Sequence, residues 1–127
     1  MDDFSLGDRE LDVMAVLWKM ESGTVGEVRE RLPVNLAYTT VLTILRNLEA
    51  KGYLTHSVEG RAHRFAPLVA QRTAQRSALH RMLAGFFGGS PEALLARLVD
   101  DHGLDAAELR VMAERIAAHP PKRRRPR

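Results

Sequence analysis

Residues 37–52 carry the side chains whose types and spacing point most clearly to a binding function. One side of this stretch presents hydroxyls, an amide and a guanidinium and includes no carboxylate: Thr39, Thr40, Thr43, Arg46 and Asn47. Such groups exchange hydrogen bonds with the edges of base pairs, and the guanidinium also pairs with phosphate. An ordinary amphipathic helix that happens to be rich in threonine would show the same residue pattern. The flanking segments must therefore decide between a DNA-binding helix and an ordinary surface helix.

The spacing of the apolar residues predicts that this stretch is an α-helix. They recur at intervals of three and four residues, and this places Val41, Ile44, Leu45 and Leu48 on one side. Gly52 is suited to end the helix, because glycine readily adopts the left-handed backbone conformation found there. The stretch therefore has one apolar side for a core and one polar side for solvent or a partner.

Two more helices are predicted before it. The apolar side of the first, at residues 8–19, consists of Leu11, Met14, Ala15 and Trp18, with Trp18 in the core. The second, at residues 25–32, begins with a capping box formed by Thr24 and Glu27. Because only a short turn separates it from the threonine-rich helix, the pair is typical of a helix-turn-helix.

A β-hairpin is predicted next. Two short runs, residues 53–58 and 61–66, flank a Glu-Gly turn. Alternation directs Leu54 inward, with Ser57 or Val58 beside it, and leaves the register of the second run open. A hairpin directly after a helix-turn-helix is a wing, and three residues near its tip could contact phosphates or the minor groove: Arg61, His63 and Arg64.

Beyond Pro67 the pattern is helical, with helices predicted at residues 70–86, 91–100 and about 106–118. Each has one apolar side, and three such helices do not easily bury one another within a single chain. We therefore expect a helical dimer interface, as in a two-fold symmetric protein that binds a palindromic DNA site. A self-contained three-helix subdomain is the alternative. The candidate interface residues are Leu79, Met82, Leu83, Phe86, Phe87, Leu94, Leu98, Met112 and Ile116.

The predicted fold is mainly α with a small β-hairpin wing. Its parts are a winged-helix DNA-binding domain at residues 6–67, a helical dimerisation domain at 68–118 and a disordered basic tail at 119–127. Residues 29–81 hold nine basic and three acidic residues, whereas the segments on either side are acidic. Such a basic middle indicates a local surface for a polyanion.

Several classes of protein are disfavoured. The chain has no cysteine, which excludes disulfides and thiolate metal sites, and its five histidines show no ligand spacing. Neither a catalytic constellation nor a nucleotide-binding glycine pattern is present, so we expect no enzyme, cofactor or metal. No signal peptide or apolar run long enough to span a membrane is seen, and this favours the cytoplasm.

Seven segments together resemble the penicillinase-repressor family of transcription factors (the BlaI/MecI type). They are residues 6–14, 17–18, 24–28, 37–43, 48–54, 59–65 and 86–90, including the motifs Tyr38-Thr39-Thr40-Val41 and Lys51-Gly52-Tyr53-Leu54. The resemblance implies a homodimeric winged-helix repressor that binds an inverted-repeat operator and controls β-lactam-resistance or related stress genes. It implies groove and phosphate contacts by Thr39, Thr40, Thr43 and Arg46, and wing contacts by Arg61 and Arg64.

The chain departs from this family in its C-terminal region. A membrane sensor-protease inactivates the family's repressors by cutting an Asn-Phe bond. The matching position here, and therefore the candidate cleavage position, is Arg97-Leu98. Because neither residue of the Asn-Phe pair is present, a sensor-protease remains only a candidate partner of this chain. A copper-responsive branch uses C-terminal cysteines, and their absence excludes copper sensing of that kind. Two rival functions are a small-molecule-gated winged-helix regulator and a winged-helix protein-interaction module without DNA binding.

Overall fold

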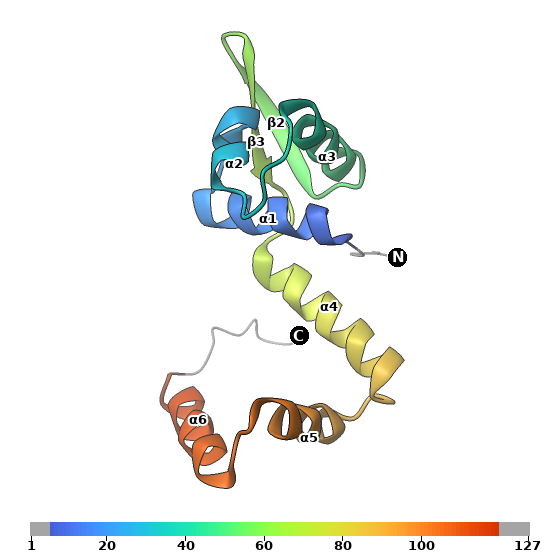
Figure 1. Cartoon of the computed structure of the whole chain (residues 1–127), viewed down its shortest axis with the longest axis vertical. Coiled ribbons are helices and arrows are strands. Elements are labelled where there is room, and N and C mark those ends of the chain that lie inside the picture. The colour runs from blue at the N-terminus through green and yellow to red at the C-terminus, as the bar shows by residue number, and fades with distance from the viewer. Residues whose placement is uncertain (1–5, 120–127) are drawn as a thin grey trace, which may run out of the picture. The chain divides into compact units, whose positions relative to one another are not determined.

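The computed structural model describes residues 6–119, and Figure 1 shows the course of the chain. The chain divides into two compact units, residues 1–80 and 81–127. Helix α4 (Gln71–Phe86) begins in the first unit and ends in the second. The boundary predicted after Pro67 falls at the end of the last strand, before this division. Apart from His119, the predicted basic tail lies outside the described residues.

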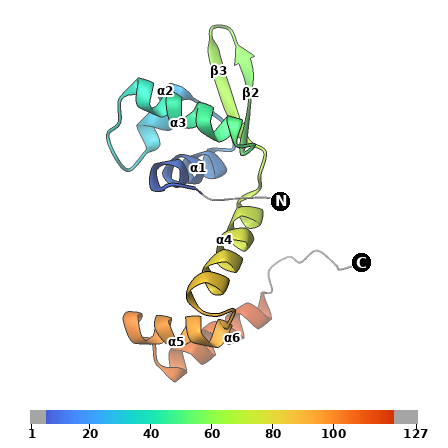
Figure 2. The same ribbon diagram turned by 90° about the vertical axis from the view of Figure 1, so that its right-hand side faces the viewer.

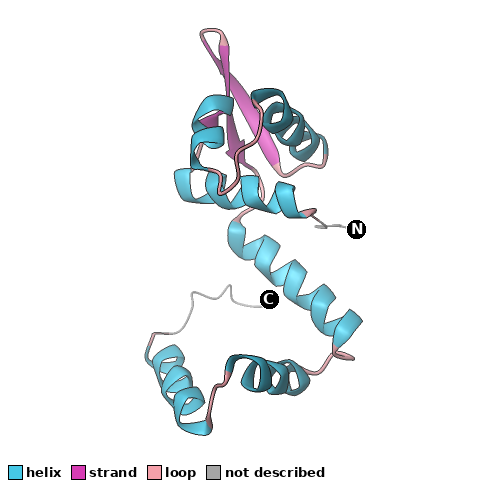
Figure 3. Cartoon of the chain, in the orientation of Figure 1, coloured by secondary structure: helices cyan, strands magenta, loops and turns pink. Residues whose placement is uncertain are grey.

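The first unit combines helices with a small sheet, as the colours of Figure 3 show. Its elements in chain order are α1 (Asp8–Met20), β1 (Gly23–Thr24), α2 (Val25–Arg31), α3 (Tyr38–Ala50), β2 (Leu54–Glu59) and β3 (Ala62–Pro67), followed by the start of α4. Because the helix pair α2–α3 leads directly into the β2–β3 hairpin, the predicted winged-helix fold is confirmed.

The sheet contains one strand more than the sequence pattern predicts. Its antiparallel order is β1-β3-β2, with Gly23 of β1 paired to Phe65 and Thr24 paired to Arg64. The strand β1 has only two residues and directly precedes α2. It therefore attaches the base of the hairpin to the connection between α1 and α2, while the tip of the hairpin projects past α2 and α3 in both views (Figures 1 and 2).

The register of the hairpin settles which of its residues face inward. Leu54 pairs with Pro67 and His56 with Phe65, and directly paired residues lie on the same side of a sheet. Leu54 and Phe65 are buried, whereas Val58 is 64% exposed. Neither Ser57 nor Val58 therefore joins the core, because the hairpin extends beyond the core at these residues.

Helices α1, α2 and α3 enclose the core together with the base of the hairpin. Its fully buried aliphatic and thioether side chains are Val13, Met14, Leu17, Val28, Val41, Leu45, Leu48 and Leu54. Three of the four apolar residues predicted for α3 are among them, and the fourth, Ile44, packs against the core while partly buried. The core thus fixes which side of α3 remains exposed.

The apolar side predicted for α1 is partly wrong. Met14 is buried as expected, but Leu11 is 49% exposed and Ala15 is also exposed, and the buried side is completed by Val13 and Leu17. Both sets satisfy helical spacing, and only the contacts of α1 with the rest of the unit choose between them. Trp18 lies partly buried at the edge, where its indole Nε1 donates a 2.9 Å hydrogen bond to the carbonyl oxygen of Val69.

The second unit contains the end of α4, then α5 (Pro91–His102) and α6 (Ala106–Ala118). Ser90 caps α5 by accepting a 3.0 Å hydrogen bond from the Ala93 N–H, and Asp105 and Glu108 form a capping box on α6. Not one described residue from 81 to 119 is buried within the single chain. The helices are therefore well delimited locally but enclose no core of their own.

No helix between residues 6 and 119 combines the length and the apolar character needed to cross a membrane.

Candidate nucleic-acid interface

The polar side of α3 is the centre of the candidate interface. All five of its predicted contact residues are exposed, on the side of the helix away from the core: Thr39, Thr40, Thr43, Arg46 and Asn47. The Thr43 hydroxyl donates a 3.0 Å hydrogen bond to the Thr39 carbonyl oxygen one turn earlier, so its oxygen remains able to accept from a partner. The side therefore offers hydroxyls, an amide and a guanidinium within two to three helical turns.

Tyr38 is a further exposed side chain at the start of α3 and is not among the predicted contacts. It is the first residue of α3 and is 50% exposed. An aromatic ring with a polar tip can pack on sugar or base methyl groups while its hydroxyl bonds to phosphate. Helical spacing does not single it out, because Tyr38 stands three and seven residues before Val41 and Leu45, in line with the apolar side of the helix.

Polar contacts at both ends hold α3 in place. At its start, the Arg29 Nε donates a 2.7 Å hydrogen bond to the Leu36 carbonyl oxygen and so spans the turn between α2 and α3. Past its end, the Lys51 ammonium lies 2.7 Å from Glu10 Oε1 of α1. Partial burial opposes ionisation of Glu10, but hydrogen bonds from Lys51 and from the Gly7 N–H outweigh it and lower the pKa of this carboxyl.

One side of the wing faces the end of α3. His56 Nδ1 lies 2.6 Å from Glu49 Oε2, and the His56 ring stacks on that of His63 with centroids 4.6 Å apart. Two of the predicted wing contacts, Arg61 and His63, are exposed. His63 is brought to the side of the hairpin that contacts α3, and Arg61 follows Gly60 in the turn at its tip.

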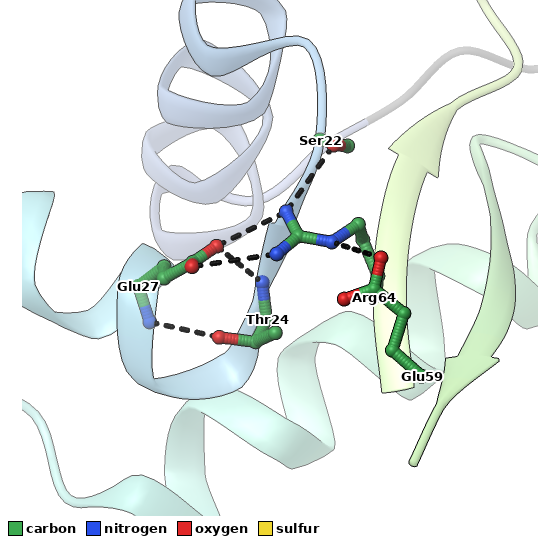
Figure 4. A network of polar contacts seen from close by, with 5 residues as sticks. All are labelled: Ser22, Thr24, Glu27, Glu59 and Arg64. Carbon is green, nitrogen blue, oxygen red and sulfur yellow. Dashed lines mark hydrogen bonds and ion pairs between the residues drawn. The ribbon is translucent and has the colours of Figure 1, made fainter. Parts of the chain in front are cut away.

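The third predicted wing contact, Arg64, is not brought together with the polar side of α3. It alternates with His63 and Phe65 along β3, so its side chain projects from the opposite side of the sheet. There the guanidinium contacts Glu27, Glu59 and Ser22 (Figure 4). The structure thus gives Arg64 protein partners where the sequence pattern predicts a nucleic-acid contact.

The predicted dimerisation residues lie on α4, α5 and α6 or just after α4. Six are exposed within the single chain, and Leu83, Phe87 and Leu94 are half-buried. The six are Leu79, Met82, Phe86, Leu98, Met112 and Ile116.

The candidate cleavage bond, Arg97-Leu98, lies inside α5, and Arg97 pairs there with Asp100 and Asp101. Among residues 6–119 no group of three His, Asp or Glu side chains is arranged to hold a metal.

Comparison with known proteins gives consistent similarities. A family model described as penicillinase repressor matches residues 6–118. The transcriptional regulator BlaI of Mycobacterium tuberculosis is 38% identical over 120 residues, which span 90% of this chain and 87% of that protein. A penicillinase repressor of Bacillus licheniformis is 27% identical over 116 residues, with 90% and 91% covered. The solution structure of the DNA-binding domain of the repressor BlaI superposes with a TM-score of 0.51 at 33% identity, covering 57% of this chain and 93% of that one.

Proposed function

Because the chain belongs to the penicillinase repressor family, we propose that it is a transcriptional repressor that binds an inverted-repeat operator in double-stranded DNA as a homodimer. Helix α3 enters the major groove, and its exposed residues read base edges and flanking phosphates. Its relatives are named as a transcriptional regulator and a penicillinase repressor, which describes regulators and not enzymes. Repression follows from occlusion of the promoter by the bound dimer.

One observation supports DNA as the ligand above all others. The exposed side of α3 carries hydroxyls, an amide and a guanidinium but no carboxylate until Glu49, which is engaged with His56. A helix that only faces water normally mixes both signs of charge. A helix that lies against phosphates and base edges cannot hold unpaired carboxylates there, because like charges repel.

The homodimer is supported by the apolar residues of the second unit. Phe86 is 83% exposed and Ile116 is 60% exposed within the single chain, and none of residues 81–119 is buried there. Exposed apolar residues that have no core to join are typical of a protein–protein interface. Pairing of two identical chains through these helices would place two copies of α3 on the two half-sites of an inverted repeat.

Two finer points belong to the same proposal. A repressor has to reach the chromosome, so the proposal includes a cytoplasmic location. Release by a membrane sensor-protease has no support in this chain beyond the family, because Arg97-Leu98 replaces the Asn-Phe pair and lies inside α5.

The test is fluorescence anisotropy with labelled duplexes from the protein's own promoter region, and from β-lactam-resistance promoters, against scrambled duplexes at several salt concentrations. We expect a preference for an inverted repeat, two protomers per site, and affinity that falls linearly with salt on logarithmic axes. Equal affinity for all duplexes would reduce the function to general polyanion binding. No binding at low salt would contradict the proposal and favour the protein-interaction module. A ligand that stabilises the protein in a thermal-shift screen would favour small-molecule gating.

A further inference from the structure

We propose that Arg64 is a positioning residue that fastens the wing to α2, so that DNA affinity depends on it through the placement of Arg61 and not through a contact of Arg64 with DNA. This inference rests on the proposed function, because it concerns how the wing is presented to the operator.

The contacts of Arg64 join the wing to two other parts of the first unit. Its Nε donates to Glu59 Oε2 at 3.1 Å, within the hairpin. Its Nη1 donates to Glu27 Oε1 at 3.1 Å and to Ser22 Oγ at 3.3 Å, and its Nη2 donates to Glu27 Oε2 at 3.4 Å. Figure 4 shows the guanidinium between these groups, with Glu27 reaching it from α2 and Glu59 from the end of β2.

We call the contacts of Arg64 with Glu27, Glu59 and Ser22 a clamp. The position of Arg64 in the sheet explains why the wing needs it. Arg64 is paired with Thr24, the last residue of β1, and also with Ser57 of β2. Beyond this point β3 has no third strand beside it, and an isolated two-stranded hairpin is marginally stable in water. Arg64 holds Glu59, the last residue of β2, and so extends the attachment toward the turn that carries Arg61.

The same contacts leave Arg64 poorly suited to bind a phosphate. Its four hydrogen bonds use most of the five N–H groups of a guanidinium. Two carboxylates face one cation, so its positive charge is already compensated. The hydrogen bonds with Glu59 and then with Glu27 raise the pKa of Arg64, and those from the Thr24 N–H and from Arg64 lower the pKa of Glu27.

Glu27→Gln separates the two roles by the sign of its effect. Glutamine can still close the capping box with Thr24, so α2 is retained while the charged contact with Arg64 is lost. If Arg64 fastens the wing, affinity for the promoter duplex that the wild-type chain prefers falls by up to about fivefold relative to Glu30→Gln, the range expected for one exposed ion pair. Glu30→Gln is the matched control, because it removes an exposed carboxylate from the same helix outside the network. If Arg64 itself contacts DNA, Glu27→Gln frees the guanidinium and affinity rises relative to the control, which would overturn the inference.

Substitutions of Arg64 provide a second, independent test. Lysine keeps the charge but loses the fork that reaches Glu59 and Glu27 together, so we expect Arg64→Lys to bind the operator as weakly as Arg64→Gln. In an Arg61→Ala background, Arg64→Gln should then lower the affinity for the operator only slightly further, because the clamp acts by positioning Arg61. Wild-type affinity of Arg64→Lys, or fully additive losses with a lower salt slope for Arg64→Gln, would instead assign a phosphate contact to Arg64.

A measurement without DNA keeps this inference separate from the proposed function. If the wild-type chain prefers no duplex, the proposed function fails, but amide hydrogen exchange across residues 55–64 still reports whether the wing is fastened. Glu27→Gln should speed exchange there and Glu30→Gln should not. Equal exchange in both variants would overturn the clamp.

Discussion

Arg46 lies on the exposed side of α3, beside Asn47, and under the proposed function its partner is either a guanine or a phosphate. If it reads a base, Arg46→Ala should weaken specific operator binding by about 1–3 kcal/mol and relax the preference for operator over scrambled duplex. If it pairs with phosphate, binding to both duplexes should weaken alike and the salt slope should fall by about 1. Arg76→Ala on α4 is the control for a general loss of positive charge. An effect of Arg46→Ala no larger than that of the control would remove Arg46 from the interface.

Glu27 should make the stability of the fold depend on pH, because hydrogen bonds from the Thr24 N–H and from Arg64 lower its pKa from the ordinary value of 4.5. A carboxyl with a lowered pKa in the folded state stabilises the fold fully above its ordinary pKa. This contribution is lost as the pH falls through the lowered value. Thermal unfolding of the wild-type chain and of Glu27→Gln should therefore differ most above about pH 5 and converge in more acidic solution. A difference that does not change with pH would mean that the charge of Glu27 is not what stabilises the fold.

At the scale of elements, prediction from the sequence succeeds where the determinants are local. The side of α3 that faces the core follows from its own periodicity, so the exposed threonines and Arg46 could be identified without a structure. The capping residues Thr24 and Glu27 are local in the same way and mark where α2 begins.

Prediction fails where a distant partner decides. Strand β1 has two residues, and its pairing with Phe65 and Arg64 comes from a segment far along the chain. The buried side of α1 is chosen by neighbours that helical spacing cannot identify. The partners of Arg64 likewise include Ser22 and Glu27, which lie about forty positions away and which the residue pattern of the wing alone does not reveal.

The end of α3 offers a test of one such local determinant. Gly52 has φ +91°, a left-handed conformation that side chains with a Cβ adopt only at a cost, and an added Cβ would meet no described atom within 4 Å. Gly52→Ala should therefore destabilise the fold by about 1–2 kcal/mol through the backbone alone. Gly26→Ala is the matched control: Gly26 lies inside α2, is equally free of neighbours and has no positive φ. It should stabilise the fold by about 0.5–1 kcal/mol. Chemical denaturation measures both, and equal effects would contradict the backbone explanation.

At the scale of the whole molecule, the two units differ in what they bury, and the proposed function assigns them different tasks. The first has a closed core that holds α3 and the wing without help from the rest of the chain. The second has capped helices and exposed apolar side chains but no buried residue among positions 81–119. A single α3 can read one half-site, and only a pair of chains can read an inverted repeat, so operator specificity should depend on residues far from any DNA contact.

Phe86 tests that dependence most directly, because it is the most exposed large apolar residue of the second unit at 83%. Burying a phenylalanine at an interface contributes about 1.5–3 kcal/mol, and a buried, unpaired carboxylate is strongly unfavourable. Phe86→Glu should therefore shift the chain from dimer to monomer in sedimentation equilibrium and weaken binding to the full inverted repeat much more than to a single half-site. Gln75→Glu, which adds the same charge to an exposed position of α4 in the first unit, should leave the dimer intact. If Phe86→Glu stays dimeric, the C-terminal helices do not form the interface. If it becomes monomeric and still prefers the full repeat as strongly as the wild type, dimerisation is not what makes the repressor specific.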